Sequence, residues 1–218
     1  MLVYHFVNAD HGIENLRKRR LKIAELHSLN DPFELFGIEM SNERVRHAFG
    51  QMKVELASNH GLLCFSEAWD NPVMWSHYAS RHNGLCLGFE IPEDRIGKVF
   101  YSRKRLVADL EKLSNPSSLS KDDVLKFLFT KYAHWRYEKE YRSFVTLEEK
   151  DPETGLYFAN FSDQLKLRRV IVGAKSILSR SNINLALGEL ASEVETFKAR
   201  LAFRTFRVVR QRNEKLWA

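Results

Sequence analysis

The sequence predicts a single α+β domain over residues 1–218, built from short mixed or antiparallel strands flanked by helices. A length of 218 residues suits one domain that buries its own core. Short apolar runs with strand-like alternation are interrupted by helices of unequal length. The chain lacks the regular strand–helix alternation of a parallel doubly wound sheet, and this absence favours the α+β class.

The first half of the chain gives strand and helix signals in turn. Alternating apolar residues predict a strand at 2–6, and helical spacing predicts helices at 10–20 and 43–57. The segment 71–78 begins with Asn-Pro and predicts a short helix. The other elements predicted in this half are strands at 21–24, 61–67, 84–90 and 99–101.

Asn30-Asp-Pro-Phe-Glu34 has the residue types of a helix start. Asp31 is placed as the N-cap, Pro32 at the first helical position, and Glu34 as the residue that closes a capping box.

The second half opens with a surface loop at 115–120, followed by a helix that Ser120 caps and that runs through Phe127 and Tyr132 towards Trp135. The remaining predictions are strands at 141–146 and 169–173, a helix at 182–198 and a closing strand at 204–210.

The formal charge of +6 is unevenly distributed. Residues 165–218 hold twelve Lys and Arg against four Glu, so a basic helix and strand are expected within 176–218. A solvated face and an anionic ligand, such as nucleic acid or a phosphate-bearing small molecule, both explain such a surface. No run has the length of a membrane span, no signal peptide is recognised, and a cytoplasmic protein without a membrane partner is expected. Histidine and cysteine spacing predicts no metal site.

The helix after Pro72 carries unusual side chains for one that only covers a core. Trp75 and Tyr78 share a face, and His77 and Arg81 share another. An aromatic ring here would stack on a flat heterocycle and favour a positively charged one. For Trp75 a core role is favoured, whereas for Tyr78 core and ligand roles stay equally open.

Glu138, Glu140 and Arg142 lie on one face if their segment is extended, because side chains alternate along a strand. Two carboxylates beside a guanidinium would hold sugar hydroxyls and stabilise a developing cation. An exposed polar strand face, or a last helical turn with a Glu138–Arg142 pair, is the favoured interpretation of this segment alone.

Several motifs together resemble a bacterial family of uncharacterised proteins, domain of unknown function 2971. The resemblance extends to about Gly173. The motifs that carry it are Tyr4-His-Phe6, Asn30-Asp-Pro-Phe-Glu34, Cys64-Phe-Ser-Glu67, Met74-Trp-Ser-His-Tyr78 and Trp135-Arg-Tyr-Glu-Lys-Glu-Tyr-Arg142.

The order of these parts also resembles the ADP-ribosyltransferase superfamily, whose fold is a split sheet. This resemblance implies that His5 binds the ribose of NAD, that Tyr78 stacks on nicotinamide, and that Glu140 supports the reacting ribose. The chain departs from the superfamily pattern in one respect, because no Gly-Thr follows His5. Whether Glu138 or Glu140 is the catalytic carboxylate stays open.

Further roles follow from the same resemblance. Ser66 would end the strand that supports the site, and Arg142 or Arg81 would meet the pyrophosphate. The expected function is an NAD-consuming ADP-ribosyltransferase-like enzyme in a toxin or phage-defence system. Its acceptor and oligomeric state are unknown, and the basic C-terminal region favours nucleic acid as the acceptor.

The alternative is a non-catalytic module that binds nucleic acid or protein through a basic surface. It relies on Arg204, Arg207 and Arg210 in place of Tyr78.

Overall fold

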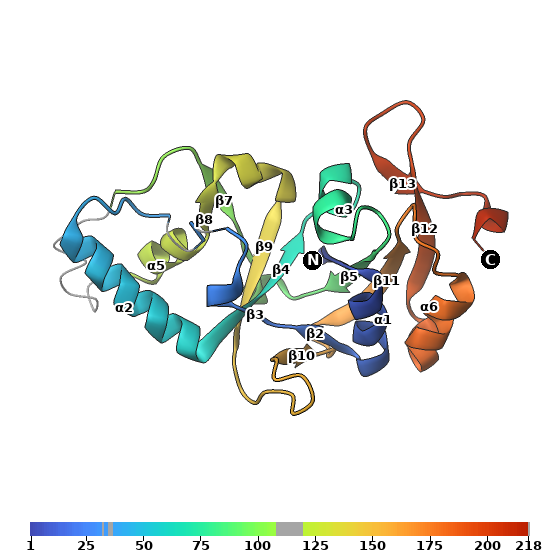
Figure 1. Ribbon diagram of the computed structural model, residues 1–218, viewed down its shortest axis with the longest axis horizontal. Coiled ribbons are helices and arrows are strands. Elements are labelled where there is room, and N and C mark those ends of the chain that lie inside the picture. The colour runs from blue at the N-terminus through green and yellow to red at the C-terminus, as the bar shows by residue number, and fades with distance from the viewer. Residues whose placement is uncertain (32, 35–36, 108–119, 218) are drawn as a thin grey trace. The chain divides into compact units, whose positions relative to one another are not determined.

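The computed structural model describes residues 1–31, 33–34, 37–107 and 120–217 (Figure 1). It has the α+β class predicted from the sequence, with a mixed sheet and flanking helices. The chain divides into two compact units. Unit 1 comprises residues 1–22, 64–96 and 158–218, and unit 2 comprises residues 23–63 and 97–157. The single domain over 1–218 stays a prediction.

Unit 1 contains helices on a sheet of mainly antiparallel strands. Its helices are α1 (Ala9–Lys18), α3 (Pro72–Tyr78) and α6 (Arg180–Leu187). Its strands are β1 (Leu2–Val7), β2 (Arg20–Lys22), β5 (Leu85–Glu90), β10 (Phe158–Asn160), β11 (Lys166–Val172), β12 (Glu195–Leu201), β13 (Val208–Arg210) and residues 64–66 of β4 (His60–Ser66).

The main sheet of unit 1 has the strand order β13-β12-β11-β5-β1-β4. The pair β11–β12 is parallel and the other pairs are antiparallel, which makes the sheet mixed. The two short strands β2 and β10 pair separately. The N-terminal strand β1 therefore lies in the interior of the sheet, between β5 and β4.

Helices α1 and α3 cover opposite faces of β1. Gly12 of α1 lies so close to Val7 and Leu85 that an added Cβ would overlap the Leu85 side chain. The buried Trp75 of α3 packs edge-on against Phe6, with ring centroids 5.3 Å apart. Successive side chains of a strand point to opposite faces, so Phe6 and Val7 define the two covered faces.

Unit 2 contains a long helix and short strands. Its helices are α2 (Glu43–Asn59) and α5 (Lys121–Leu128), with a 3₁₀ segment η4 (Ala133–Glu138). Its strands are β3 (Ala24–Glu25), residues 60–63 of β4, β6 (Gly97–Lys98), β7 (Phe100–Ser102), β8 (Thr130–Tyr132) and β9 (Glu140–Thr146). Strand β4 lies between β3 and β9, which pairs in turn with β6, and β7 pairs with β8.

Helix α2 begins at Glu43, where the side chain of Asn42 caps the backbone N–H of Arg44. The helix expected at 43–57 is confirmed. Val45 and Phe49 are buried in a small core with Ile38 and Phe127.

Three predicted elements are wrong. The helix expected to run from Ser120 towards Trp135 ends at Leu128, and Tyr132 lies in strand β8. The helix expected at 182–198 ends at Leu187, because Gly188 adopts a positive φ of 56° and the following residues form β12. Of the closing strand at 204–210, only residues 208–210 are extended, and the residues before them form the end of a hairpin.

The predicted helix start at Asn30–Glu34 is only partly visible. The Asp31 side chain accepts a hydrogen bond from Phe33 N–H (2.9 Å), as a capping residue would. Glu34 instead directs its carboxylate to two basic side chains. Pro32 and residues 115–119 of the predicted loop lie outside the described residues.

Within the described ranges, no helix combines the length and apolarity that crossing a membrane requires.

Candidate functional site

A cluster of five buried charged side chains lies in unit 2. Lys131 Nζ lies 2.7 Å from Glu138 Oε2, 3.1 Å from Glu140 Oε2 and 3.3 Å from Glu34 Oε2. Arg142 completes the cluster, and all five side chains are at most 6% exposed. Three carboxylate side chains thus surround the two basic side chains Lys131 and Arg142.

Arg142 makes the most specific contacts of the cluster. Its Nε donates to Oε1 of Glu140 (2.8 Å) and its Nη2 to Oε2 of the same carboxylate (2.9 Å). Its Nη2 also lies 2.5 Å from Glu34 Oε1, and its Nη1 donates to the Leu128 carbonyl (3.0 Å). This two-bond arrangement fixes the plane of the Glu140 carboxylate.

The local backbone explains how neighbouring carboxylates reach one lysine. Glu138 ends the 3₁₀ segment η4, and Glu140 begins strand β9. Lys139 between them is left-handed, with φ 45° and ψ 50°, and ends the 3₁₀ segment before the strand begins. Tyr101 anchors the strand, because its hydroxyl accepts a hydrogen bond from Glu140 N–H (2.8 Å).

The charges in the cluster oppose the effect of burial. Burial alone would raise the pKa of Glu140, but Arg142 and Lys131 outweigh it and hold this pKa well below its ordinary value. Burial would lower the pKa of Lys131, but the carboxylates of Glu140, Glu34 and Glu138 raise it above its ordinary value. Glu140 and Lys131 therefore stay ionised at neutral pH.

A basic pocket in unit 2 adjoins Lys131. It has a volume of about 250 Å³. The basic and aromatic residues among those that line it are Phe33, Arg103, Lys104, Arg105, Lys131 and Tyr132. The Arg105 guanidinium lies 4.9 Å from the centre of the Phe33 ring, and the Tyr132 ring stacks on His134. Cations beside exposed rings suit a ligand with phosphate and a flat heterocycle.

In unit 1, His5 is held in one tautomer. Its Nδ1 lies 3.0 Å from the Cys64 carbonyl, which only accepts, so Nδ1 carries the proton. Burial lowers the pKa of His5, and the bond to Cys64 only partly opposes this shift. A neutral imidazole with a protonated Nδ1 presents Nε2 as an acceptor.

The strand alternation places His5 on the opposite face of β1 from Phe6 and hence from α3. Ser66 is buried at the end of β4, directly opposite Tyr4 in the sheet. Tyr78 is the half-buried last residue of α3. The meeting of His5, Tyr78 and Glu140 in one cleft stays a prediction.

Arg81 is exposed within an unusual left-handed run. Ser80, Arg81 and His82 have φ values of 46°, 56° and 72°, and none of them is glycine. Hydrogen bonds from Arg81 N–H to the Ser76 carbonyl (3.3 Å) and from His82 N–H to the Trp75 carbonyl (3.1 Å) hold the run. Backbone of this kind costs about 1–3 kcal/mol per residue and is concentrated at functional sites.

Sequence reasoning brought together only part of the cluster. Glu138, Glu140 and Arg142 do converge, but they are buried and not an exposed polar face, and Glu138 lies outside the strand. Lys131 and Glu34 were missed as members. The signal for Glu34 was its place in the Asn30–Glu34 motif, whereas Lys131 lay within a segment predicted as helix.

Residues 74–143 match the model of a family described as "Protein of unknown function (DUF2971)". The match confirms the resemblance over this segment, about a third of the chain. It includes Tyr78, Arg81 and four of the five residues of the buried cluster. Comparison with curated proteins and with solved structures gave no significant match.

Proposed function

We propose that this protein is an ADP-ribosyltransferase-like enzyme that cleaves the nicotinamide–ribose bond of NAD and transfers ADP-ribose to an acceptor. The observation that carries the proposal is the Glu140 carboxylate, which Lys131 and Arg142 keep ionised and fixed in orientation. The family resemblance stated from the sequence assigns the catalytic role to this same position or to Glu138.

The proposed chemistry needs a fixed negative charge. When the bond between nicotinamide and ribose breaks, its electron pair leaves with nicotinamide and positive charge develops on the ribose. A carboxylate already ionised and oriented stabilises that charge without reorganising during the reaction. A carboxylate near the ribose therefore favours the transition state, in which positive charge develops on the ribose, over the ground state. The acceptor then attacks the ribose carbon and loses its proton.

The resemblance assigns NAD binding to His5 and Tyr78, although His5 lies on the face of β1 opposite to α3, the helix that ends at Tyr78. His5 Nε2, an acceptor in the tautomer that the bond to the Cys64 carbonyl favours, would accept a hydrogen bond from a ribose hydroxyl. The Tyr78 ring would stack on nicotinamide, whose positive charge favours an aromatic face. Ser66 is buried and supports the strand rather than contacting a ligand directly.

The pyrophosphate of NAD is assigned to exposed cations. Arg81 is exposed and suits this role. Arg142 suits it poorly, because its guanidinium already contacts Glu140, Glu34 and the Leu128 carbonyl. Arg103 and Arg105 of the basic pocket are a further place for phosphate groups.

The test is nicotinamide release from NAD labelled in the nicotinamide ring, with water or added acceptor. We expect Glu140→Gln to reduce release by at least 100-fold, since it removes the charge but keeps the shape. Glu149→Gln, on an exposed residue of the same unit, is the matched control and is expected to leave release unchanged.

Because Glu140 also pairs with buried cations, a melting curve first checks that each variant is folded at the assay temperature. Tyr78→Ala, at a half-buried position, provides a second arm and is expected to raise KM for NAD. No nicotinamide release from the wild-type protein, under conditions where it is folded and NAD is in excess, would overturn the proposal. Unchanged release by folded Glu140→Gln and Glu138→Gln would remove the cluster from the mechanism.

A further inference from the structure

The hairpin that joins β12 to β13 in unit 1 exposes two phenylalanines. Phe203 is 91% exposed and Phe206 is 99% exposed. The loop is closed by a hydrogen bond from Ala202 N–H to the Arg207 carbonyl (2.9 Å) and projects beyond the sheet (Figure 1). Two nearly fully exposed rings add nothing to the core, and so they point to a partner.

The same segment carries the whole net charge of the chain. Residues 196–213 hold six Lys and Arg and neither Asp nor Glu, while the chain has 34 basic and 28 acidic residues. The remainder of the chain is therefore neutral overall. Charge concentrated in one short segment, and not spread over the surface, marks an anionic partner.

The charges are interleaved with the rings. Arg204 lies between Phe203 and Phe206 in sequence, and the Arg200 guanidinium lies 4.5 Å from the centre of the Phe203 ring. Among the described residues, no carboxylate lies within ion-pair distance of Arg204. Arg207 and Arg210 differ, because they pair with Asp70 (3.4 Å) and Glu195 (2.5 Å).

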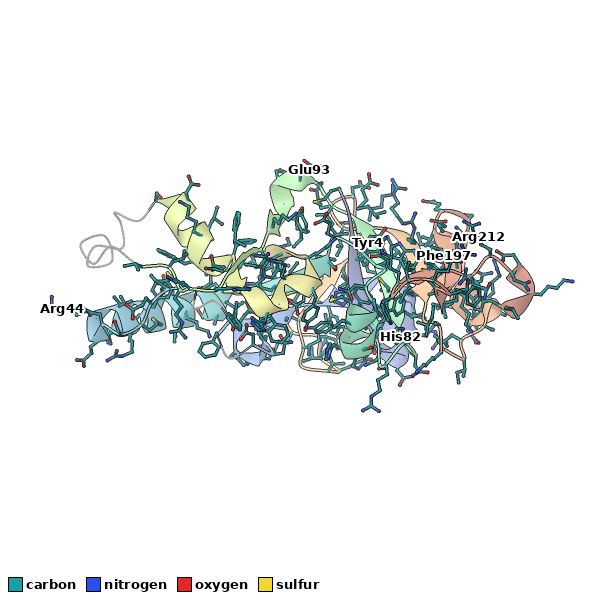
Figure 2. All side chains as sticks on the ribbon, turned by 90° about the horizontal axis from the view of Figure 1, so that it is seen from above. Tyr4, Arg44, His82, Glu93, Phe197 and Arg212 are labelled. Atoms are coloured by element: carbon teal, nitrogen blue, oxygen red, sulfur yellow. The ribbon has the colours of Figure 1, made fainter. Side chains whose placement is uncertain are left out.

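The foot of the hairpin adds further aromatic and charged side chains. A hollow of about 410 Å³ is lined by Tyr4, Trp69, Arg207 and Arg210, together with the acidic residues Glu67 and Asp70. Next to it, Arg169 donates to the Tyr4 hydroxyl (2.9 Å), and the guanidinium groups of Arg169 and Arg210 lie over the ring of Phe197. Figure 2 labels Tyr4 and Phe197 of this region. The hairpin is anchored here, because Val208 N–H donates to the Asp70 carbonyl (2.9 Å).

We infer that this hairpin binds single-stranded nucleic acid, with Phe203 and Phe206 stacking on bases and Arg204 contacting phosphate. Single strands offer unpaired bases to aromatic side chains and a phosphate for each base, which matches the alternation of rings and cations. A lipid surface would be met better by a continuous apolar face than by rings separated by an unpaired arginine. The inference is independent of NAD cleavage.

The test measures fluorescence anisotropy of a labelled 15-nucleotide oligo-dT with the full chain at several salt concentrations. Loss of a stacked base typically weakens binding by about tenfold or more, so Phe203→Ala with Phe206→Ala should weaken it by about 100-fold. This double variant should keep the salt dependence. Arg204→Gln should instead lower the slope of log K against log salt by about 0.7.

Two matched controls separate the hairpin from general effects. Arg44→Gln removes the same charge from an exposed position on α2, and Ile177→Ala removes an apolar side chain that is 97% exposed in unit 1. Both should bind as the wild type does. Duplex DNA of the same length should bind less tightly than the single strand, because its bases are already stacked.

Three outcomes would overturn the inference. The first is no change in anisotropy with oligo-dT up to 50 µM protein, a concentration of the order at which nonspecific binding would already appear. The second is equal loss of binding in the Arg44→Gln control. The third is cosedimentation with phosphatidylserine vesicles that the double phenylalanine variant abolishes while oligo-dT binding stays, which would assign the hairpin to a membrane surface.

Discussion

Arg142 binds both oxygens of the Glu140 carboxylate from two residues further along the same strand, through bonds of 2.8 and 2.9 Å. Residues two apart on a strand share a face, so strand β9 itself brings the pair together. The side chains of Arg142 and Glu140 are only 1% and 6% exposed. The pair therefore fixes the orientation of the Glu140 carboxylate. It also makes the stability of unit 2 depend on compensation between buried charges.

Replacing Arg142 with methionine should destabilise the protein by about 3–5 kcal/mol. The substitution keeps much of the volume but removes one of the two cations of the cluster, so that Lys131 alone faces the buried carboxylates of Glu34, Glu138 and Glu140. Urea unfolding at neutral pH measures the effect. Arg44→Met, at an exposed position, should change stability by no more than about 0.5 kcal/mol. Equal small effects of the two substitutions would show that the buried pair is not needed for stability.

The cluster should also make the protein sensitive to acid. The pKa of Glu140 is lower in the folded protein than its ordinary value of 4.5, so the unfolded chain takes up this proton more readily. The stabilisation is complete above pH 4.5 and is lost as the pH falls below it. The stability difference between wild type and Glu140→Gln should shrink over this range. If the stability difference between the two proteins stays constant from pH 7 to pH 3, the lowered pKa of Glu140 in the folded protein is contradicted.

Some of the fold was predictable because local patterns agree with tertiary packing. The apolar spacing of α2 and the Asn-Pro start of α3 indicated both helices correctly. The helix predicted at 182–198 wrongly included the first four residues of β12, because parallel pairing with β11 decides the structure of that segment and no local pattern encodes it.

The candidate site was predictable only in part, for a related reason. Glu138, Glu140 and Arg142 are close in sequence, so their convergence was visible in the local pattern. Lys131 and Glu34 reach the same cluster through folding of distant segments, and no local spacing encodes that approach. The burial of the cluster could not be anticipated either, since charged residues are usually exposed.

Two glycines should respond in opposite directions to substitution by alanine. A Cβ at Gly84 would overlap the Val7 carbonyl oxygen, a backbone atom that cannot move without disturbing β1. Gly84→Ala should therefore destabilise the protein by about 1–3 kcal/mol or more. Gly50 lies within α2 with open space around its Cβ position, so Gly50→Ala should stabilise by about 0.5–1 kcal/mol. Thermal unfolding of both variants tests the pair, and a stable Gly84→Ala variant would contradict the close approach to β1.

Removing the hydroxyl of Tyr101 should destabilise the protein at the start of β9. It accepts the N–H of Glu140 at the first residue of β9, and burial raises its own pKa to about 12, so it remains protonated at neutral pH. Tyr101→Phe would leave that N–H unsatisfied in a largely buried place and should cost about 1–3 kcal/mol. It should also loosen Glu140, so nicotinamide release should fall if the proposed function is correct. Tyr132→Phe removes the hydroxyl of a tyrosine that is 48% exposed and should leave stability unchanged. Urea unfolding of the two variants side by side gives the comparison, and equal midpoints would mean that the Tyr101 hydroxyl does not hold the start of the strand.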